Sequence, residues 1–409
     1  MKMEVPLLML LVLFLVTYIQ RSVVATLLHD EELKVTRKLD LINKPATKTF
    51  VTKYGDILDC VEIDKQLAFD HPLLKNHSIQ MKPNFKIPKR RRLNTFSSST
   101  LIPSQRRLLP KKVRCQEGTV LIKRIQEEDL AMEKFSPSLG MKFPTSNSYN
   151  FAYPNDDQPP QVHNQVAALV TFTQNTGAAG IINLWSPEVK PDQYSDAVIF
   201  VANDDGVVAN AIVIGWAVNP LINQTFFTRL YTYWTKDSGQ STGCYNAMCA
   251  GFVQTSQEIT LGQLLSPISV YWGRQYYVDL TVRQDLKTKN WWLLNGEDSV
   301  GYWPKELFTT LTNGAIRAGW GGEIQSPVTE TAPGMGSGHF AKEGYARACL
   351  MKDLKLYAPM SFPAEKDLKL YLSKPECYGV LYEDSPGPGE GGEWGHSIFF
   401  GGPPGCSMS

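Results

Sequence analysis

The stretch that decides the fold is residues 228–254, TRLYTYWTKDSGQSTGCYNAMCAGFVQ. Residues 230–234 are of the types that fill a pleated, half-buried strand, and the Asp-Ser-Gly cluster after them ends such a strand. The stretch therefore predicts a β-hairpin. Cys244 and Cys249 enclose only four residues, a spacing that allows a disulfide within one loop in an oxidising compartment. No second Cys or His pair follows at ligand spacing, so a metal site is the poorer reading.

The composition suits a large β protein without a nucleic-acid partner. The chain has 409 residues, of which 43% are apolar and 11% aromatic, and its net charge is +1. An excess of Lys and Arg, which is needed to displace the counterions of phosphates, is absent overall. Gly, Tyr, Trp and Thr are enriched after residue 160, which indicates β structure in that part of the chain.

The N-terminus predicts a secreted protein. Residues 5–19 are almost wholly apolar, Lys2 precedes them, and Ala25 ends a small-residue site that suits cleavage of a signal peptide over 1–25. An uncleaved anchor is the alternative, although about 20 apolar residues are needed to span a bilayer. We expect no membrane contact after cleavage, and a location outside the cell, in the cell wall or in the vacuole. Asn76 and Asn223 stand in sequons and become candidate glycosylation sites in that pathway.

Residues 26–128 differ from the rest and predict a small mixed α+β module. Apolar residues recur at helical spacing from Leu28 to Ile42, and residues 51–63 alternate as in a strand. Between residues 81 and 114 there are eleven Lys or Arg and no Asp or Glu. This run is typical of a solvated linker, and the alternatives are a processing site or a polyanion-binding patch. A Cys60–Cys115 disulfide would hold the module together if this linker were cut.

A second change of character follows over residues 129–160, which are rich in Pro, Ser and Asn and predict a boundary loop. From 161 to 409 short β-type runs alternate with Gly, Asn, Asp and Pro at intervals typical of an antiparallel β-sandwich. We therefore predict an all-β main domain there. Only residues 304–314 are expected to be helical, with Pro304 at the start and Gly314 at the end.

Many short segments in order resemble one family. Residues 56–83, DILDCVEIDKQLAFDHPLLKNHSIQMKP, resemble the activation peptide of the neprosin family, a plant-rich group of secreted proteins. INLWSP, IGWAVNP, YWTKDSGQSTGCYN, VGYWP, WGGEI, MGSGHF and WGHSIFFGGPPGC resemble its catalytic domain. The resemblance implies the precursor of a glutamic peptidase, a β-sandwich enzyme that cleaves at proline with two Glu carboxylates and no metal or cofactor. It also implies that the chain's own activation module is a partner.

The two carboxylates of such an enzyme divide the proton transfers. One must be ionised to take a proton from water, and the other must be protonated to donate to the leaving nitrogen. Two carboxyl groups held close together meet both needs, because their like charges prevent both from being ionised at once. The resemblance places the second Glu at Glu323 and the first at position 213, where this chain has Val213. Loss of a general acid or base costs on the order of 100- to 10,000-fold. We expect both residues on neighbouring strands facing one groove, and Val213→Glu to raise activity; Asp204 and Asp205 are weaker replacements.

Other candidate sites are less well supported. Ser337 and His339 lie in GMGSGHF, which follows no strand and opens no helix, so a nucleophile elbow is not expected there. Cys349 lies in a helical-looking context and is expected to be a buried, unreactive thiol. Most tryptophans are expected in the core, but some aromatic side chains can line the groove and stack on proline or sugar rings. The candidates for substrate binding are Trp216, Tyr233, Trp234 and Trp320.

Two functions therefore remain open from the sequence. One is a non-catalytic or weakened protein that keeps the groove for proline-containing peptides, or for cell-wall polysaccharide. The other is an active proline-directed endopeptidase that uses Glu323 with another acid. For the disulfides we predict Cys60–Cys115, Cys244–Cys249 and Cys377–Cys406, the last as a clamp on the Gly-rich C-terminal segment.

Overall fold

The computed structural model describes residues 33–87, 113–130, 162–358, 362–384 and 394–407, except positions 205, 207 and 224. The predicted signal peptide, most of the basic linker and the boundary loop lie outside these residues. No described helix is long and apolar enough to cross a membrane.

The N-terminal module is a small α+β unit, as predicted. A helix over residues 33–42 precedes a three-stranded antiparallel sheet in the order β1-β2-β3, formed by Ala46–Val51, Ile57–Glu62 and Thr119–Lys123. Two 3-10 turns, η1 (Leu67–Asp70) and η2 (Pro72–Leu74), and the short helix α2 (Glu127–Leu130) complete it. Cys60 and Cys115 are disulfide-bonded and buried against Leu58 and Leu121, so the bridge is also part of the module's core.

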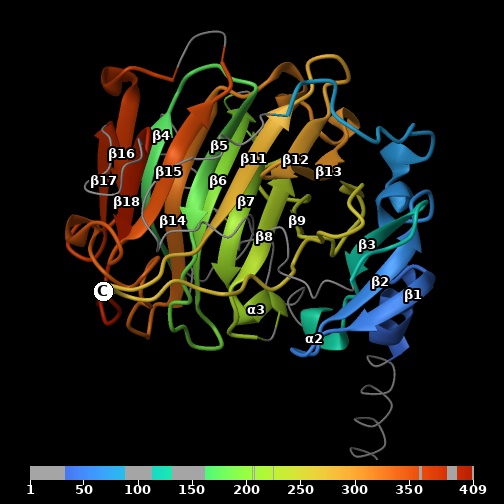
Figure 1. Cartoon of the computed structure of the whole chain (residues 1–409), viewed down its shortest axis with the longest axis horizontal. Coiled ribbons are helices and arrows are strands. Elements are labelled where there is room, and N and C mark those ends of the chain that lie inside the picture. The colour runs from blue at the N-terminus through green and yellow to red at the C-terminus, as the bar shows by residue number, and fades with distance from the viewer. Residues whose placement is uncertain are drawn as a thin grey trace, which may run out of the picture.

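The main domain is an antiparallel β-sandwich, which confirms the predicted fold class (Figure 1). The seven-stranded sheet has the order β16 (Leu368–Leu372), β4 (Val162–Thr171), β14 (Arg317–Pro327), β6 (Tyr194–Asp204), β7 (Ala209–Val218), β8 (Arg229–Thr235), β9 (Cys244–Tyr245). The eight-stranded sheet has the order β10 (Val253–Gln254), β13 (Asp298–Trp303), β12 (Trp291–Asn295), β11 (Tyr277–Gln284), β5 (Gly177–Asn183), β15 (Cys349–Leu356), β18 (His396–Gly401), β17 (Gly379–Asp384).

Each strand of the seven-stranded sheet divides its side chains between two faces. On β7, Ile212, Ile214 and Trp216 join the large core cluster that both sheets share, whereas Ala211 and Val213 belong to a second cluster. Successive side chains of a strand point to opposite faces, so the second cluster covers the face away from the sandwich core. We call this face, which carries Val213, Phe200 and Tyr233, the outer face of the seven-stranded sheet.

Local predictions in the main domain were confirmed in part. β8 and β9 form the expected hairpin, with Tyr233 opposite Tyr245. Residues 304–314 form no α-helix but two 3-10 turns, η4 (Lys305–Leu307) and η5 (Leu311–Asn313), because Phe308 and Leu311 are drawn into the core. Cys349 begins β15 rather than lying in a helix.

The three predicted disulfides are all present. Cys60 is bonded to Cys115, Cys244 to Cys249 and Cys377 to Cys406. Cys349 is the remaining cysteine and is buried as a free thiol, which the sequence also predicted.

The described part of the module packs at the edge of the sandwich, and Figure 1 shows β1, β2 and β3 beyond β9 and β13. Ala68 packs with Trp292 and Tyr302, on the face of the eight-stranded sheet that points away from the core. Gln66 exchanges two hydrogen bonds with the backbone of Gln254. Asp56 forms a buried ion pair with Arg229. The module therefore contacts both sheets at this edge, since Ala68 packs on the eight-stranded sheet and Asp56 reaches Arg229 of the seven-stranded sheet.

Candidate functional site

Val213 lies in the middle of β7 and is fully buried on the outer face. It pairs with Phe200 of β6 on one side and with Tyr233 of β8 on the other. All three belong to the same apolar cluster. The two side chains that flank Val213 do not exchange protons at acid pH. Phe200 has no ionisable group, and burial raises the pKa of the Tyr233 hydroxyl to about 12.

We call residues that lie side by side across adjacent strands a row. In β14, the residue in the row of Val213 is Gly319. Phe200 pairs with Val213 on one side and with Gly319 on the other, so the row runs from β7 through β6 to β14. The Phe200 ring lies directly over Gly319, and a Cβ atom there would collide with it. A carboxylate pair in this row would need acids at positions 213 and 319, and the chain has Val and Gly.

Glu323 lies four residues further along β14 and is 2% exposed. It stands on the outer face, as expected, but β6 separates β14 from β7. The residue of β7 in line with Glu323 is Ala217, since Ala217 pairs with Asp196 and Asp196 is bonded to Glu323. At about 3.3 Å per residue, the four-residue offset alone is roughly 13 Å. The expectation that Glu323 and Val213 face each other on neighbouring strands is therefore wrong.

A second carboxylate that the sequence interpretation missed lies beside Glu323. The backbone N–H of Glu323 donates a hydrogen bond of 2.9 Å to Oδ1 of Asp196, which is 1% exposed in β6. Burial, and next the charge of Glu323, raise the pKa of Asp196 well above its usual range, although the hydrogen bond lowers it. The signal was available in YSDAVIFV, where Asp196 is the one acid in a segment whose following residues are all apolar.

Three tyrosines surround this carboxylate pair. Tyr194 and Tyr231 are buried, and Tyr245 is partly buried beside them. The pKa values of all three are raised well above the usual one, first by removal from solvent and then in part by the charges of Asp196 and Glu323. Tyr245 belongs to the Cys244–Cys249 loop and its ring lies 6.0 Å from that of Tyr231. The pair is therefore closed off from solvent by aromatic rings and is able to hold a proton at a pH where an exposed Asp is ionised.

The weaker replacement acids do not reach this region. Asp204 is at the other end of β6, eight residues from Asp196, and forms an ion pair with Arg317. Asp205 lies outside the described residues.

The proposed aromatic contacts with substrate are corrected for three of the four residues. Trp216, Trp234 and Trp320 point into the core between the sheets. The indole N–H groups of Trp216 and Trp320 donate to the backbone oxygens of Asn183 and Ala179. Only Tyr233 lies on the outer face. A Gly-Trp pair at a strand position places the large ring on the core side and the glycine on the outer side.

The remaining candidates have structural roles. Ser337 lies in a turn, as predicted, and its Oγ accepts a hydrogen bond from the backbone N–H of His339. The His339 ring instead approaches Glu343 at 3.2 Å. Burial raises the pKa of the Cys349 thiol well above its usual value, which makes it a poor nucleophile. Asn76 is exposed, whereas the side chain of Asn223, at the end of α3 (Pro220–Asn223), is outside the described set.

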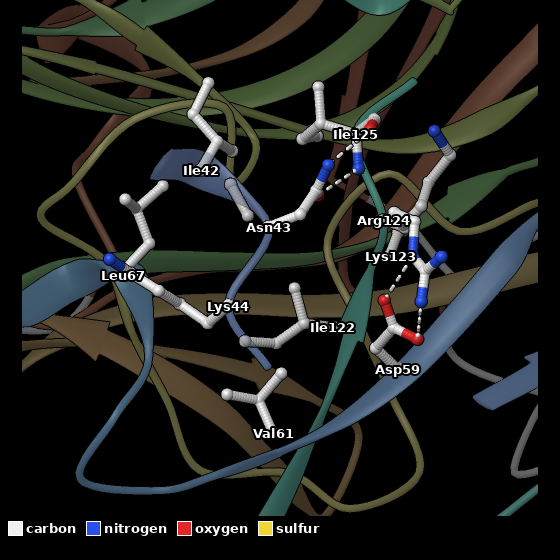
Figure 2. A pocket seen from close by; sticks show the side chains of 11 residues that line it. Ile42, Asn43, Lys44, Asp59, Val61, Leu67, Ile122, Lys123, Arg124 and Ile125 are labelled. Atoms are coloured by element: carbon white, nitrogen blue, oxygen red, sulfur yellow. Dashed lines mark hydrogen bonds and ion pairs between the residues drawn. The ribbon is translucent and has the colours of Figure 1, made fainter. Parts of the chain in front are cut away.

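A small pocket lies in the N-terminal module, remote from both Val213 and Glu323 (Figure 2). Figure 2 shows that Asp59 pairs with Arg124 and that Asn43 bonds to the backbone of Ile125. Ala247 of the Cys244–Cys249 loop completes the lining. Lys44 and Lys123 of the lining pair with Asp70 and Asp129 outside it, so its charged groups already have partners and the pocket lies where the module meets the loop.

Comparison with solved structures gives remote matches to peptidases and a lectin. Scytalido-glutamic peptidase with a transition-state analogue inhibitor is 10% identical with a TM-score of 0.32, over 58% of this chain and 97% of that chain. SCP-B, a member of the Eqolisin family in complex with the tripeptide Ala-Ile-His, is 8% identical with a TM-score of 0.30, over 58% and 96%. CG-16, a homodimeric agglutinin from chicken liver, is 8% identical with a TM-score of 0.21, over 39% and 98%.

Two family models match the sequence itself. The model of the Neprosin activation peptide matches residues 49–167, which include β2, β3 and the second half of β1. The model named Neprosin matches residues 191–403, more than half of the chain and most of the sandwich, with Val213, Asp196 and Glu323 inside it. The chain belongs to the Neprosin family.

Proposed function

We propose that this protein is a secreted Neprosin-family precursor that binds peptides along the outer face of its seven-stranded sheet, without acid–base chemistry in the row of Val213. The observation that carries the proposal is the composition of that row, which consists of Val213, Phe200 and Gly319. Peptide hydrolysis by a carboxylate pair needs one group that accepts a proton and one that donates it. None of these three side chains does either.

Family membership and the disulfides support the remaining parts of the proposal. The activation peptide precedes the main domain, which is the arrangement of a precursor. Three disulfides fit the oxidising conditions of the secretory pathway. Proline-containing peptides are the proposed ligands, since the family resemblance implies them. The carbohydrate alternative loses its basis, because three of the four aromatic residues proposed to stack on sugar are in the core.

One observation favours a second candidate function, an active peptidase with a different pair of acids. Asp196 is hydrogen-bonded to the backbone of Glu323, and its raised pKa lets one carboxyl stay protonated while the other is ionised. Such a pair is displaced along the sheet from the row of Val213. The two candidates differ in whether bound peptide is cut.

One experiment separates them. A labelled proline-containing peptide is incubated with the full chain, with Glu323→Gln and with Asp196→Asn from pH 3 to 7, and binding is followed by anisotropy and cleavage by mass spectrometry. The proposal expects binding and no cleavage above background. Cleavage that both substitutions abolish would establish the second candidate, and the absence of any binding would refute the first.

A further inference from the structure

The outer face becomes polar at one end, next to Asp196 and Glu323. Gln325 of β14 pairs with Asn164 of β4 on one side and with Tyr194 of β6 on the other. Asn219 directly follows Val218, the last residue of β7, which pairs with Ser195. Gln325 lies two residues after Glu323 on β14, and Asn164 lies two residues before Val166 on β4. Both side chains therefore stand on the outer face. We call Asn164, Gln325 and Asn219, together with Asp196 and Glu323, the acceptor patch.

Among the described residues, three amide oxygens of the acceptor patch find no hydrogen-bond partner. They are Oδ1 of Asn164, Oε1 of Gln325 and Oδ1 of Asn219, and all three atoms are buried. Gln325 is only 4% exposed and Asn219 only 3%. Buried polar groups of native proteins are nearly always satisfied, and an unpaired one lowers stability. Three such oxygens at one end of one face indicate that a donor group is missing from the site.

The chemistry of the patch restricts that donor. Amide oxygens and carboxylates accept hydrogen bonds, and two nearby carboxylates favour a positive charge. The row from Asn164 to Asn219 crosses three strand spacings, roughly 14 Å, whereas a metal ion holds its oxygens at about 2.0–2.6 Å. A single metal ion cannot satisfy oxygens so far apart. An organic cation with several N–H groups, carried on an extended chain, can do so.

We propose that the acceptor patch binds the cationic group of a bound peptide, a guanidinium or an ammonium, and so selects basic peptides. The inference rests on the proposed function and names the class of peptide it binds. The arginine fork matches carboxylates in geometry, and the neighbouring amide oxygens accept from backbone N–H groups of the same peptide. Tyr194 lies opposite Gln325, and Tyr231 and Tyr245 lie close enough to Asp196 and Glu323 to interact with their charges.

Binding of a cation is coupled to the proton of the carboxylate pair. Among the titratable groups around Asp196, the charge of Glu323 disfavours its ionised form. Tyr194, Tyr231 and Tyr245 have pKa values raised well above the usual one and stay neutral. Arg229, in the same row, is already paired with Asp56 of the module at 2.9 Å. A bound cation stabilises the ionised carboxylate, so a proton is released and the affinity rises with pH.

The test compares peptides that differ only in charge. The full chain is titrated with a labelled peptide that contains proline and arginine, and with the same peptide carrying citrulline in place of arginine. Each is made with a free and with an acetylated N-terminus, which separates a side-chain cation from the terminal amine. We expect at least a tenfold weaker affinity when the cation that occupies the patch is removed, and a weaker affinity at pH 4 than at pH 7.

Variants of the chain complete the test. Asp196→Asn is expected to remove the preference for the charged peptide over the citrulline, acetylated peptide. Asp192→Asn is the matched control, because it removes the same charge at an exposed site just before β6. Thermal unfolding confirms that each variant folds, and the peptide comparison needs no variant at all.

The outcomes separate this inference from the proposed function. Equal affinity for charged and neutral peptides would overturn the inference while peptide binding stands. If no peptide binds, the proposed function fails and the inference fails with it. An arginine preference that Asp192→Asn abolishes as fully as Asp196→Asn does would also overturn it, because a general surface charge would then explain the preference.

Discussion

The backbone amide of Glu323 donates a hydrogen bond to the carboxylate of Asp196 across the β14–β6 pair, at 2.9 Å, with both side chains almost wholly buried. This contact brings together two acids that are 127 residues apart in the chain. The two acids therefore lie away from Val213, toward the end of the outer face where β7 meets α3.

Asp196→Asn is predicted to make stability less dependent on pH. The folded-state pKa of Asp196 is raised above the unfolded value, so the folded state holds the proton more tightly. The resulting loss of folding stability is absent below the unfolded-state pKa. It grows as the pH rises above that value and is complete above the folded-state pKa. We expect thermal unfolding of the unaltered chain to lose more stability than the variant between pH 4 and 7. If the variant loses more stability between pH 4 and pH 7 than the unaltered chain does, this prediction is contradicted.

Val213→Glu alone is predicted to leave peptidase activity unchanged, which reverses the expectation from the sequence. The new carboxyl would lie beside Phe200 and Tyr233, with Gly319 rather than an acid in its row. Burial of an unpaired polar group there costs on the order of 2 to 5 kcal/mol of unfolding free energy.

Denaturant unfolding and a peptide-cleavage assay measure the two effects of this change. Val213→Gln is the control, because it has the size of Glu without the ionisable group. A clear gain in cleavage by Val213→Glu, without a gain by Val213→Gln, would show that an acid reaches position 213 after all.

Asp56→Asn is predicted to loosen the N-terminal module. Asp56 pairs with Arg229 at 2.9 Å, and both side chains are buried between the module and β8. Removal of one partner of a buried pair leaves an uncompensated charge and costs about 3–5 kcal/mol. Limited proteolysis should then cut the module faster.

The control for Asp56→Asn is Glu62→Gln, which breaks the exposed pair with Lys65 in the same module. Exposed pairs contribute little, so this variant should resist proteolysis as the unaltered chain does. Equal sensitivity of both variants would mean that the Asp56–Arg229 pair does not hold the module.

Cleavage of the basic linker is predicted to leave the module in one covalent piece. Cys60 in β2 and Cys115 before β3 are disulfide-bonded, and the acid-free run of residues 82–114 lies between them. After limited trypsin treatment, a gel without reductant should show no fragment that ends inside this run, and reductant should release one. Release without reductant would contradict the prediction, and Cys60→Ser should produce it.

The sequence predicted a large part of the fold correctly, because the relevant signals are local. Short runs of β-branched and aromatic residues mark β6, β7 and β8, and the short Cys244–Cys249 spacing marks a loop disulfide. Residues 304–314 and the segment around Cys349 were assigned to helix wrongly, since burial of Leu311 and Cys349 overrode local helix signals.

The sequence by itself determined that the side chain at position 213 cannot accept or donate a proton, because valine has no ionisable group in any fold. Because side chains alternate along a strand, Tyr233 and Trp234 lie on opposite faces, although both were predicted to line the groove. Only the tertiary structure decided which residues share a row. The register between β6 and β14 depends on packing across more than a hundred residues of chain, and that register sets Gly319 in line with Val213 and Asp196 beside Glu323.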